Sequence, residues 1–188
     1  MLTCKPDYDK AKQRIDAFWE CEVVDRALTY IMFPRPEAEQ VPMPTPPDAP
    51  RAKKLDIEYR VRAAEARMRN TVWYADSMPV AQPSLGPATV AAWFGLGLDF
   101  DEKTSWATHD IAEWPDDLSD ILTFDPEKGY FKTSVALTTA LREAGKGQFI
   151  TGIQEWLSPA DILSAARGPD RFCIDLIDCP ERIVALSE

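Results

Sequence analysis

The sequence predicts an α/β fold with a parallel sheet, chiefly because of the order of its elements. A short apolar strand, a loop and a helix follow one another three times, near residues 27–33, 71–75 and 149–153. Strands that alternate with helices imply parallel pairing with right-handed crossovers. With 188 residues, 45% of them hydrophobic and 28% charged, residues 1–188 suit a single domain with a buried core.

A helix, a strand and a proline-rich loop come first. Residues 7–19 carry apolar side chains at helical spacing, which predicts an N-terminal helix. Residues 27–33 are apolar on both faces, as in a buried parallel strand. Prolines crowd residues 34–52, which therefore favour an extended loop over a helix or a central strand. A second helix with an apolar stripe is expected over residues 53–69.

The stretch 70–95 places the first candidate catalytic residue. Thr71–Ala75 is a short β-branched and aromatic run that predicts one strand, and Asp76 stands where that strand ends. A helix is expected over residues 87–94, with proline in its first turn. Ligands of α/β proteins bind beyond the carboxyl ends of parallel strands, so Asp76 is expected to be catalytic. The competing interpretation is that Asp76 stiffens a turn.

The only histidine of the chain, His109, follows two short extended segments over residues 96–100 and 104–108. A histidine next to an aspartate can serve acid–base chemistry, and Asp110 is adjacent. Neighbouring residues on a strand point to opposite faces, however, which argues against a dyad. We therefore expect His109 to contribute to substrate binding.

The last third repeats the opening layout. Residues 149–153 predict a strand, and Glu155 and Trp156 lie at its carboxyl end, where a site is expected. Ser158 suits the N-cap of the next helix. Helices are expected over residues 114–122, 130–144, 158–167 and 170–178, and from residue 180 onward.

Composition excludes several classes of protein. The net charge of −10 argues against nucleic-acid binding, because little is present to neutralise a phosphate backbone. No signal peptide and no membrane-length apolar run is present, so we expect a cytoplasmic protein. The four cysteines have no zinc-type spacing, and no glycine-rich phosphate loop is found.

Three motifs carry a resemblance to a known family. They are WECEVVDRAL near the start, NTVWYADSMPVAQPSLGPATVAAWFG in the middle and TGIQEWLSPADILSAARGPDRFCIDLIDCPERI near the end. Their order and spacing resemble the uroporphyrinogen decarboxylase superfamily, which includes corrinoid-dependent methyltransferases. The resemblance implies an α/β fold that is part of a (β/α)8 TIM barrel. This would be its N-terminal portion, with parallel strands and an N-terminal helical extension.

The resemblance also implies a type of site. In the decarboxylases an aspartate after an early strand binds pyrrole N–H groups, and Asp76 matches it. Glu155 would lie with Asp76 at the same open end of the barrel, as a second catalytic carboxylate. Tyr74, His109 and Trp156 would bind substrate. The basic residues that bind propionates in the family have no clear counterpart near the start of this sequence.

Cofactors and partners follow from the same resemblance. No cofactor or metal is expected in this chain, since zinc or a corrinoid would need the C-terminal half of such a barrel. A tetrapyrrole or corrinoid-type ligand is expected, and so is either a homo-oligomer or a complementing C-terminal half. The alternative hypothesis is a non-catalytic remnant that associates with itself or with a partner.

Overall fold

The computed structural model describes residues 1–108, 111–120, 122–127 and 129–187. These residues form two compact units. Unit 1 comprises Met1–Pro47, Asp56–Pro83 and Leu137–Ile153, and unit 2 comprises Asp48–Leu55, Ser84–Ala136 and Gln154–Glu188. No helix in the described part of the chain combines the length and the apolar character needed to cross a membrane.

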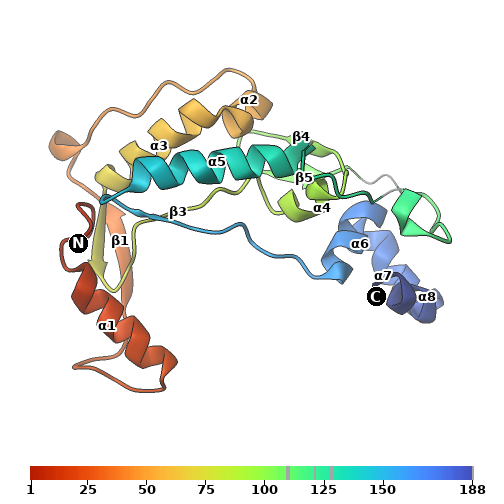
Figure 1. Ribbon diagram of the computed structural model, residues 1–188, viewed down its shortest axis with the longest axis horizontal. Coiled ribbons are helices and arrows are strands. Elements are labelled where there is room, and N and C mark those ends of the chain that lie inside the picture. Colours follow the sequence, from red (N-terminus) through yellow and green to blue (C-terminus); the bar gives the residue numbers. More distant parts are fainter. Residues whose placement is uncertain (109–110, 121, 128, 188) are drawn as a thin grey trace. The chain divides into compact units, whose positions relative to one another are not determined.

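Unit 1 contains two small sheets and three helical segments (Figure 1). Its strands are β1 (Tyr30–Pro34), β2 (Thr71–Ala75), β3 (Val80–Ala81) and β6 (Ile150–Thr151). Its helices are α1 (Tyr8–Trp19), α3 (Ile57–Asn70) and the part of α5 (Gly129–Gly145) from Leu137 onward, with the short 3-10 helix η1 (Glu37–Glu39) in the proline-rich segment.

The strands of unit 1 overturn the predicted partial barrel. β1 and β2 pair antiparallel, with Met32 opposite Trp73. They therefore form a two-stranded ribbon and are not neighbouring strands of a parallel barrel. Among the described residues only β3 and β6 pair in parallel, over two residues each. The described chain thus holds three separate two-stranded sheets and no barrel.

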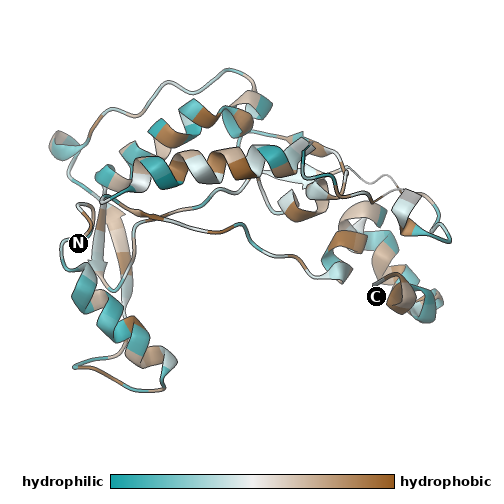
Figure 2. Ribbon diagram, viewed as in Figure 1, coloured by the Kyte–Doolittle hydropathy of each residue, from teal (hydrophilic) through white to brown (hydrophobic). Residues whose placement is uncertain are grey.

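Two local features explain why the prediction of a parallel sheet was wrong. The apolar run before Pro34 looked buried because both of its faces are apolar, yet every residue of β1 is exposed. The middle of β1 accordingly shows as an apolar stretch in Figure 2. The parallel strand β3 lies within the segment that was expected to be a loop, and it is short because Pro79 and Pro83, which lack N–H donors, flank it.

Unit 2 is mainly helical. It contains the antiparallel hairpin of β4 (Leu98–Phe100) and β5 (Ser105–Ala107) and the remainder of α5. The other elements are α2 (Pro50–Leu55), α4 (Thr89–Trp93), η2 (Leu118–Asp120), α6 (Pro159–Arg167), α7 (Pro169–Asp178) and α8 (Pro180–Ser187). The helix expected over residues 114–122 is reduced to η2.

The core of unit 2 joins helices to the hairpin. Buried Ala91 of α4, Ala107 of β5 and Ala166 of α6 pack together with Leu96 and Ile111. A second cluster of Leu163, Phe172 and Ile183 holds α6, α7 and α8 together. Each of these helices therefore packs through apolar residues on one face.

Candidate functional site

Asp76 lies at the end of β2, where the chain turns sharply. Ala75 has a φ of 55°, which is unusual for a residue with a side chain. The backbone N–H of Asp76 donates to the Thr29 carbonyl (2.9 Å), and the Thr29 N–H donates to Asp76 Oδ2 (2.9 Å). This reciprocal pair fixes Asp76 against the segment that precedes β1.

Two arginines bind the Asp76 carboxylate. Arg26 donates from Nη1 to Oδ2 (2.5 Å) and from Nη2 to Oδ1 (3.1 Å), and Arg14 donates from Nη1 to Oδ1 (3.2 Å). Asp76 is only 4% exposed, so both carboxylate oxygens are buried and fully engaged. A buried carboxylate held in this way orients the guanidinium groups around it.

A second layer fixes the arginines and the strand end. Asp25 accepts from Arg14 Nε and Nη2, both at 2.8 Å, and so locks the Arg14 guanidinium in place. The buried Lys5 ammonium donates to the carbonyls of Trp73 (2.9 Å) and Ala75 (2.6 Å). The N-terminal segment is thereby attached to the end of β2 by charged hydrogen bonds.

The arginines keep Asp76 ionised. Burial on its own raises the pKa of Asp76, but the hydrogen bonds from Arg26, Thr29 and Arg14 outweigh burial and bring this pKa below its ordinary value. Hydrogen bonding from Arg14 likewise lowers the pKa of Asp25. Both carboxylates are therefore anions at neutral pH.

A cationic hollow of about 460 Å³ opens beside this cluster. Its lining includes the cations Lys10, Arg14 and Arg26, the acidic Asp7, which pairs with Lys5 (3.0 Å), and Trp73 and Tyr74 of β2. Lys10 is exposed, and no ion pair engages its ammonium within the described residues. The hollow can therefore take an anionic group next to an aromatic surface.

The structure brings together two of the five predicted site residues. Asp76 and Tyr74 belong to unit 1, and Tyr74, which is 59% exposed, lines the cationic hollow. Glu155 and Trp156 belong to unit 2 and are exposed, and the Trp156 ring lies edge-on to Trp93 at 6.3 Å. His109 lies outside the described residues.

The sequence analysis did not identify the three cations of the hollow. Lys10 and Arg14 are four residues apart on α1 and so share one face of the helix, a signal that the sequence offered. Arg26 gave no such signal, because it comes from the connection after α1 and meets a carboxylate 50 residues later in the chain. These residues supply basic groups beside Asp76, which the motif comparison had not found.

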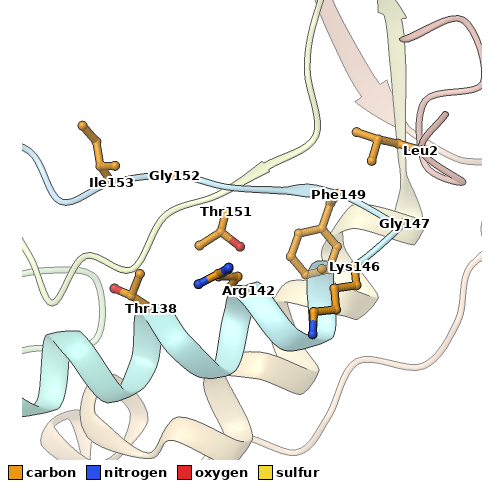
Figure 3. Close-up of a pocket in the computed structure, with 10 residues that line it drawn as sticks. Leu2, Thr138, Arg142, Lys146, Gly147, Phe149, Thr151, Gly152 and Ile153 are labelled. Carbon is orange, nitrogen blue, oxygen red and sulfur yellow. The ribbon is translucent and has the colours of Figure 1, made fainter. Parts of the chain in front are cut away.

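A second hollow of unit 1, of about 430 Å³, lies between α5 and β6 (Figure 3). Arg142 and Thr138 of α5 and Thr151 of β6 point into it in the close-up. The Ile150 and Gly152 N–H groups donate to the carbonyls of Pro79 and Ala81, so β3 occupies one edge of β6. This hollow contains none of the predicted site residues.

Unit 2 has its own buried carboxylate, Asp175. Arg167 donates from Nε to Asp175 Oδ2 (2.7 Å) and from Nη2 to Oδ1 (3.3 Å), and the Trp114 indole N–H donates to Oδ2 (2.7 Å). Hydrogen bonding from Arg167 lowers the pKa of Asp175 more than burial raises it. Arg167 also contacts the Trp114 ring, with Cζ 5.7 Å from its centroid. This cluster joins α6, α7 and the segment that contains Trp114.

The described residues do not form a metal site. No group of three or more histidine, cysteine, aspartate or glutamate side chains among them is placed to hold a metal ion. The four cysteines are free thiols. The zinc chemistry of the methyltransferases thus has no ligand set in this part of the chain.

Comparison of the chain with protein-family models, with curated proteins and with solved structures returned no match. The geometry around Asp76 and the three sequence motifs are therefore the basis of the functional proposal.

Proposed function

We propose that this chain is related to the uroporphyrinogen decarboxylase superfamily and binds a carboxylated tetrapyrrole in the cationic hollow. One observation carries the proposal: Lys10, Arg14 and Arg26 gather beside Trp73 and Tyr74 around the turn that contains Asp76. An aromatic macrocycle with peripheral carboxylates combines the two chemistries that this lining recognises. The volume of about 460 Å³ suits one edge of such a ligand rather than the whole macrocycle.

Each residue has a separate role in this proposal. Lys10 supplies a charge for a carboxylate, and Tyr74 contacts the ring system. Asp76 is a positioning residue, because its two oxygens already accept hydrogen bonds from Arg14, Arg26 and Thr29. In this arrangement the chain binds a tetrapyrrole, and decarboxylation would need a free carboxylate that Asp76 does not provide.

The direct test is a titration with uroporphyrin followed by its Soret absorbance. We expect saturable binding that Lys10→Gln weakens about tenfold, as loss of one charged hydrogen bond implies. Lys12→Gln is the matched control, since Lys12 lies on the same helix, pairs with Asp16 and does not line the hollow. Equal affinities for the two variants would remove the hollow as the binding site.

A second measurement tests catalysis. Incubation of the chain with uroporphyrinogen, followed by chromatographic separation of the porphyrins after oxidation, reports any loss of carboxyl groups. We expect binding without decarboxylation. Product formation that is lost in Asp76→Asn would restore a catalytic role for Asp76.

The second candidate function is self-association, and the exposed strand β1 favours it. Ile31 and Phe33, on one face of β1, are 41% and 47% exposed, and within the described part of the chain β1 pairs with β2 on one edge only. An unpaired apolar edge strand is a template for pairing with a second copy. Sedimentation velocity over a concentration series tests this: a dimer that Ile31→Glu dissociates supports it, and a monomer at all concentrations rules it out.

A further inference from the structure

Unit 1 contains an apolar cavity that the proposed tetrapyrrole site does not use. Its volume is about 520 Å³, within the range of about 300–1,000 Å³ that is typical of small-molecule sites. Tyr30 and Met32 of β1, Trp73 of β2 and Met78 contribute its apolar lining, and Arg67 of α3 lies at its border. Only Trp73 also lines the cationic hollow.

Strand register explains why these side chains meet. Met32 lies directly opposite Trp73 in the antiparallel pair, and Tyr30 lies two residues away on the same face. The Trp73 indole N–H donates to the Met68 carbonyl (3.1 Å), which holds the ring in one orientation. Met32 is 54% exposed, so this face of the ribbon is accessible from solvent. An aromatic ring held in this way, with methionine thioethers beside it in the lining, suits a flat, polarisable ligand.

The charge in the lining of this cavity is positive. Arg67 is the only charged residue in its lining, and no acidic residue lines it, in a chain whose net charge is −10. No hydrogen bond or ion pair holds the Arg67 guanidinium within the part of the chain that the structure describes. Burial, with the nearby Arg67 charge, also lowers the pKa of Arg60, which lies seven residues earlier on α3. The Arg67 guanidinium therefore gives this cavity a positive charge that is suited to an anion.

We propose that this cavity binds a planar aromatic compound that carries a carboxylate, with its ring against Met32 and Trp73 and its carboxylate on Arg67. The site is separate from Lys10, Arg14 and Arg26, so it goes beyond the proposed tetrapyrrole function. The ring contributes affinity through apolar contact, and Arg67 selects the anion over a neutral analogue.

The first experiment uses the fluorescent anion 8-anilinonaphthalene-1-sulfonate as reporter and 2-naphthoate as competitor. We expect 2-naphthoate to displace the reporter from the wild-type chain, and the neutral 2-naphthalenemethanol to do so about tenfold less well. Arg67→Gln is expected to weaken 2-naphthoate about tenfold. Arg62→Gln, on the same helix and paired with Glu58, is the control and is expected to change the affinity less than twofold.

A second pair of variants tests the face of the ribbon. Met32→Glu places a carboxylate in the cavity and is expected to abolish 2-naphthoate binding, whereas Ile31→Glu, on the opposite face of the same strand, is expected to preserve it. Both side chains are exposed in the wild-type chain, so circular dichroism is expected to show intact folds.

Three results would overturn the proposal. They are equal affinities of the Arg67 and Arg62 variants, equal losses in the Met32 and Ile31 variants, and no displacement of the reporter by 2-naphthoate from a wild-type chain that sediments as a dimer and that Met32→Glu converts to a monomer. The last result would assign this face to a second copy. Uroporphyrin titration of Arg67→Gln separates the two sites, because the tetrapyrrole proposal expects unchanged binding there.

Discussion

Each unit of the molecule contains a buried aspartate that is bound by arginine. The two clusters differ in how far apart in sequence their residues lie. Asp76 of unit 1 binds Arg14 and Arg26, which precede it by 62 and 50 residues. Asp175 of unit 2 binds one arginine, Arg167, only eight residues away, and completes its shell with the Trp114 indole. The first cluster thus carries more charge and joins more distant segments of the chain.

This difference separates the candidate ligand site around Asp76 from a purely structural cluster around Asp175. The Arg167 guanidinium donates to Asp175 and to the carbonyls of Ile111 and Ala112, and it contacts the Trp114 ring. It is therefore engaged in structural contacts. Around Asp76, by contrast, the side chain of Arg26 is 36% exposed at the edge of a hollow that Lys10 also lines. Both units contain a buried carboxylate, so the carboxylate does not distinguish the candidate binding site. The additional cationic groups beside Asp76 do.

The largest effect is expected from Asp76→Ala. This variant leaves two arginines without their buried partner, which costs about 3 kcal/mol of unfolding free energy. Urea denaturation measures the loss. The control is Asp9→Ala, an exposed aspartate at the start of α1, for which we expect a change below about 1 kcal/mol. Similar values for the two variants would mean that the Asp76 cluster contributes no special stability.

Asp175→Ala is expected to cost less, about 2 kcal/mol, because a single arginine loses its partner and backbone carbonyls still bind it. The same denaturation experiment applies. Asp178→Ala, three residues later on α7 and exposed, serves as its control and is expected to be near neutral. A greater loss for Asp175 than for Asp76 would reverse the comparison between the units.

Acidification acts on both clusters in the same direction. The folded-state pKa values of Asp76 and Asp175 lie below the ordinary 3.8, so both carboxylates stabilise the fold above that pH. This stability is lost as the pH falls through the lower folded-state pKa values. Urea midpoints from pH 7 to pH 2.5 are expected to fall below about pH 4 in the wild type and to fall less steeply in Asp76→Asn. An unchanged slope in this variant contradicts the prediction.

Helices such as α1 and α6 were predictable from the sequence because their signals are local, whereas the helix expected over residues 114–122 is only η2. Ser158 caps α6 because its side chain accepts from the Asp161 N–H. The Asp161 carboxylate in turn accepts from the Ser158 N–H, which completes a capping box. The β2 strand was likewise confirmed over Thr71–Ala75. Each of these features depends on residues within a few positions of one another.

The partial barrel was wrong because strand pairing is not local. An apolar run such as residues 30–34 does not encode its partner or its direction, and β1 in fact pairs antiparallel with β2. Asp76 was identified as a site candidate from its place after a strand, although the parallel sheet behind that argument is not there. Arg14 and Arg26, which bind Asp76, are distant from it in sequence, so the spacing of residues could not reveal their contact with Asp76.

The smallest effect is expected at the indole that distinguishes the Asp175 cluster. Trp114→Phe keeps an aromatic face for Arg167 but removes the N–H that donates to Asp175 Oδ2, which costs about 1 kcal/mol. Trp106→Phe, on β5 and 45% exposed, is the control because no hydrogen bond of its indole is found among the described residues. If both variants melt at the wild-type temperature, Asp175 gains nothing from the indole. Its shell then reduces to one arginine, and the contrast with the two arginines of Asp76 becomes sharper.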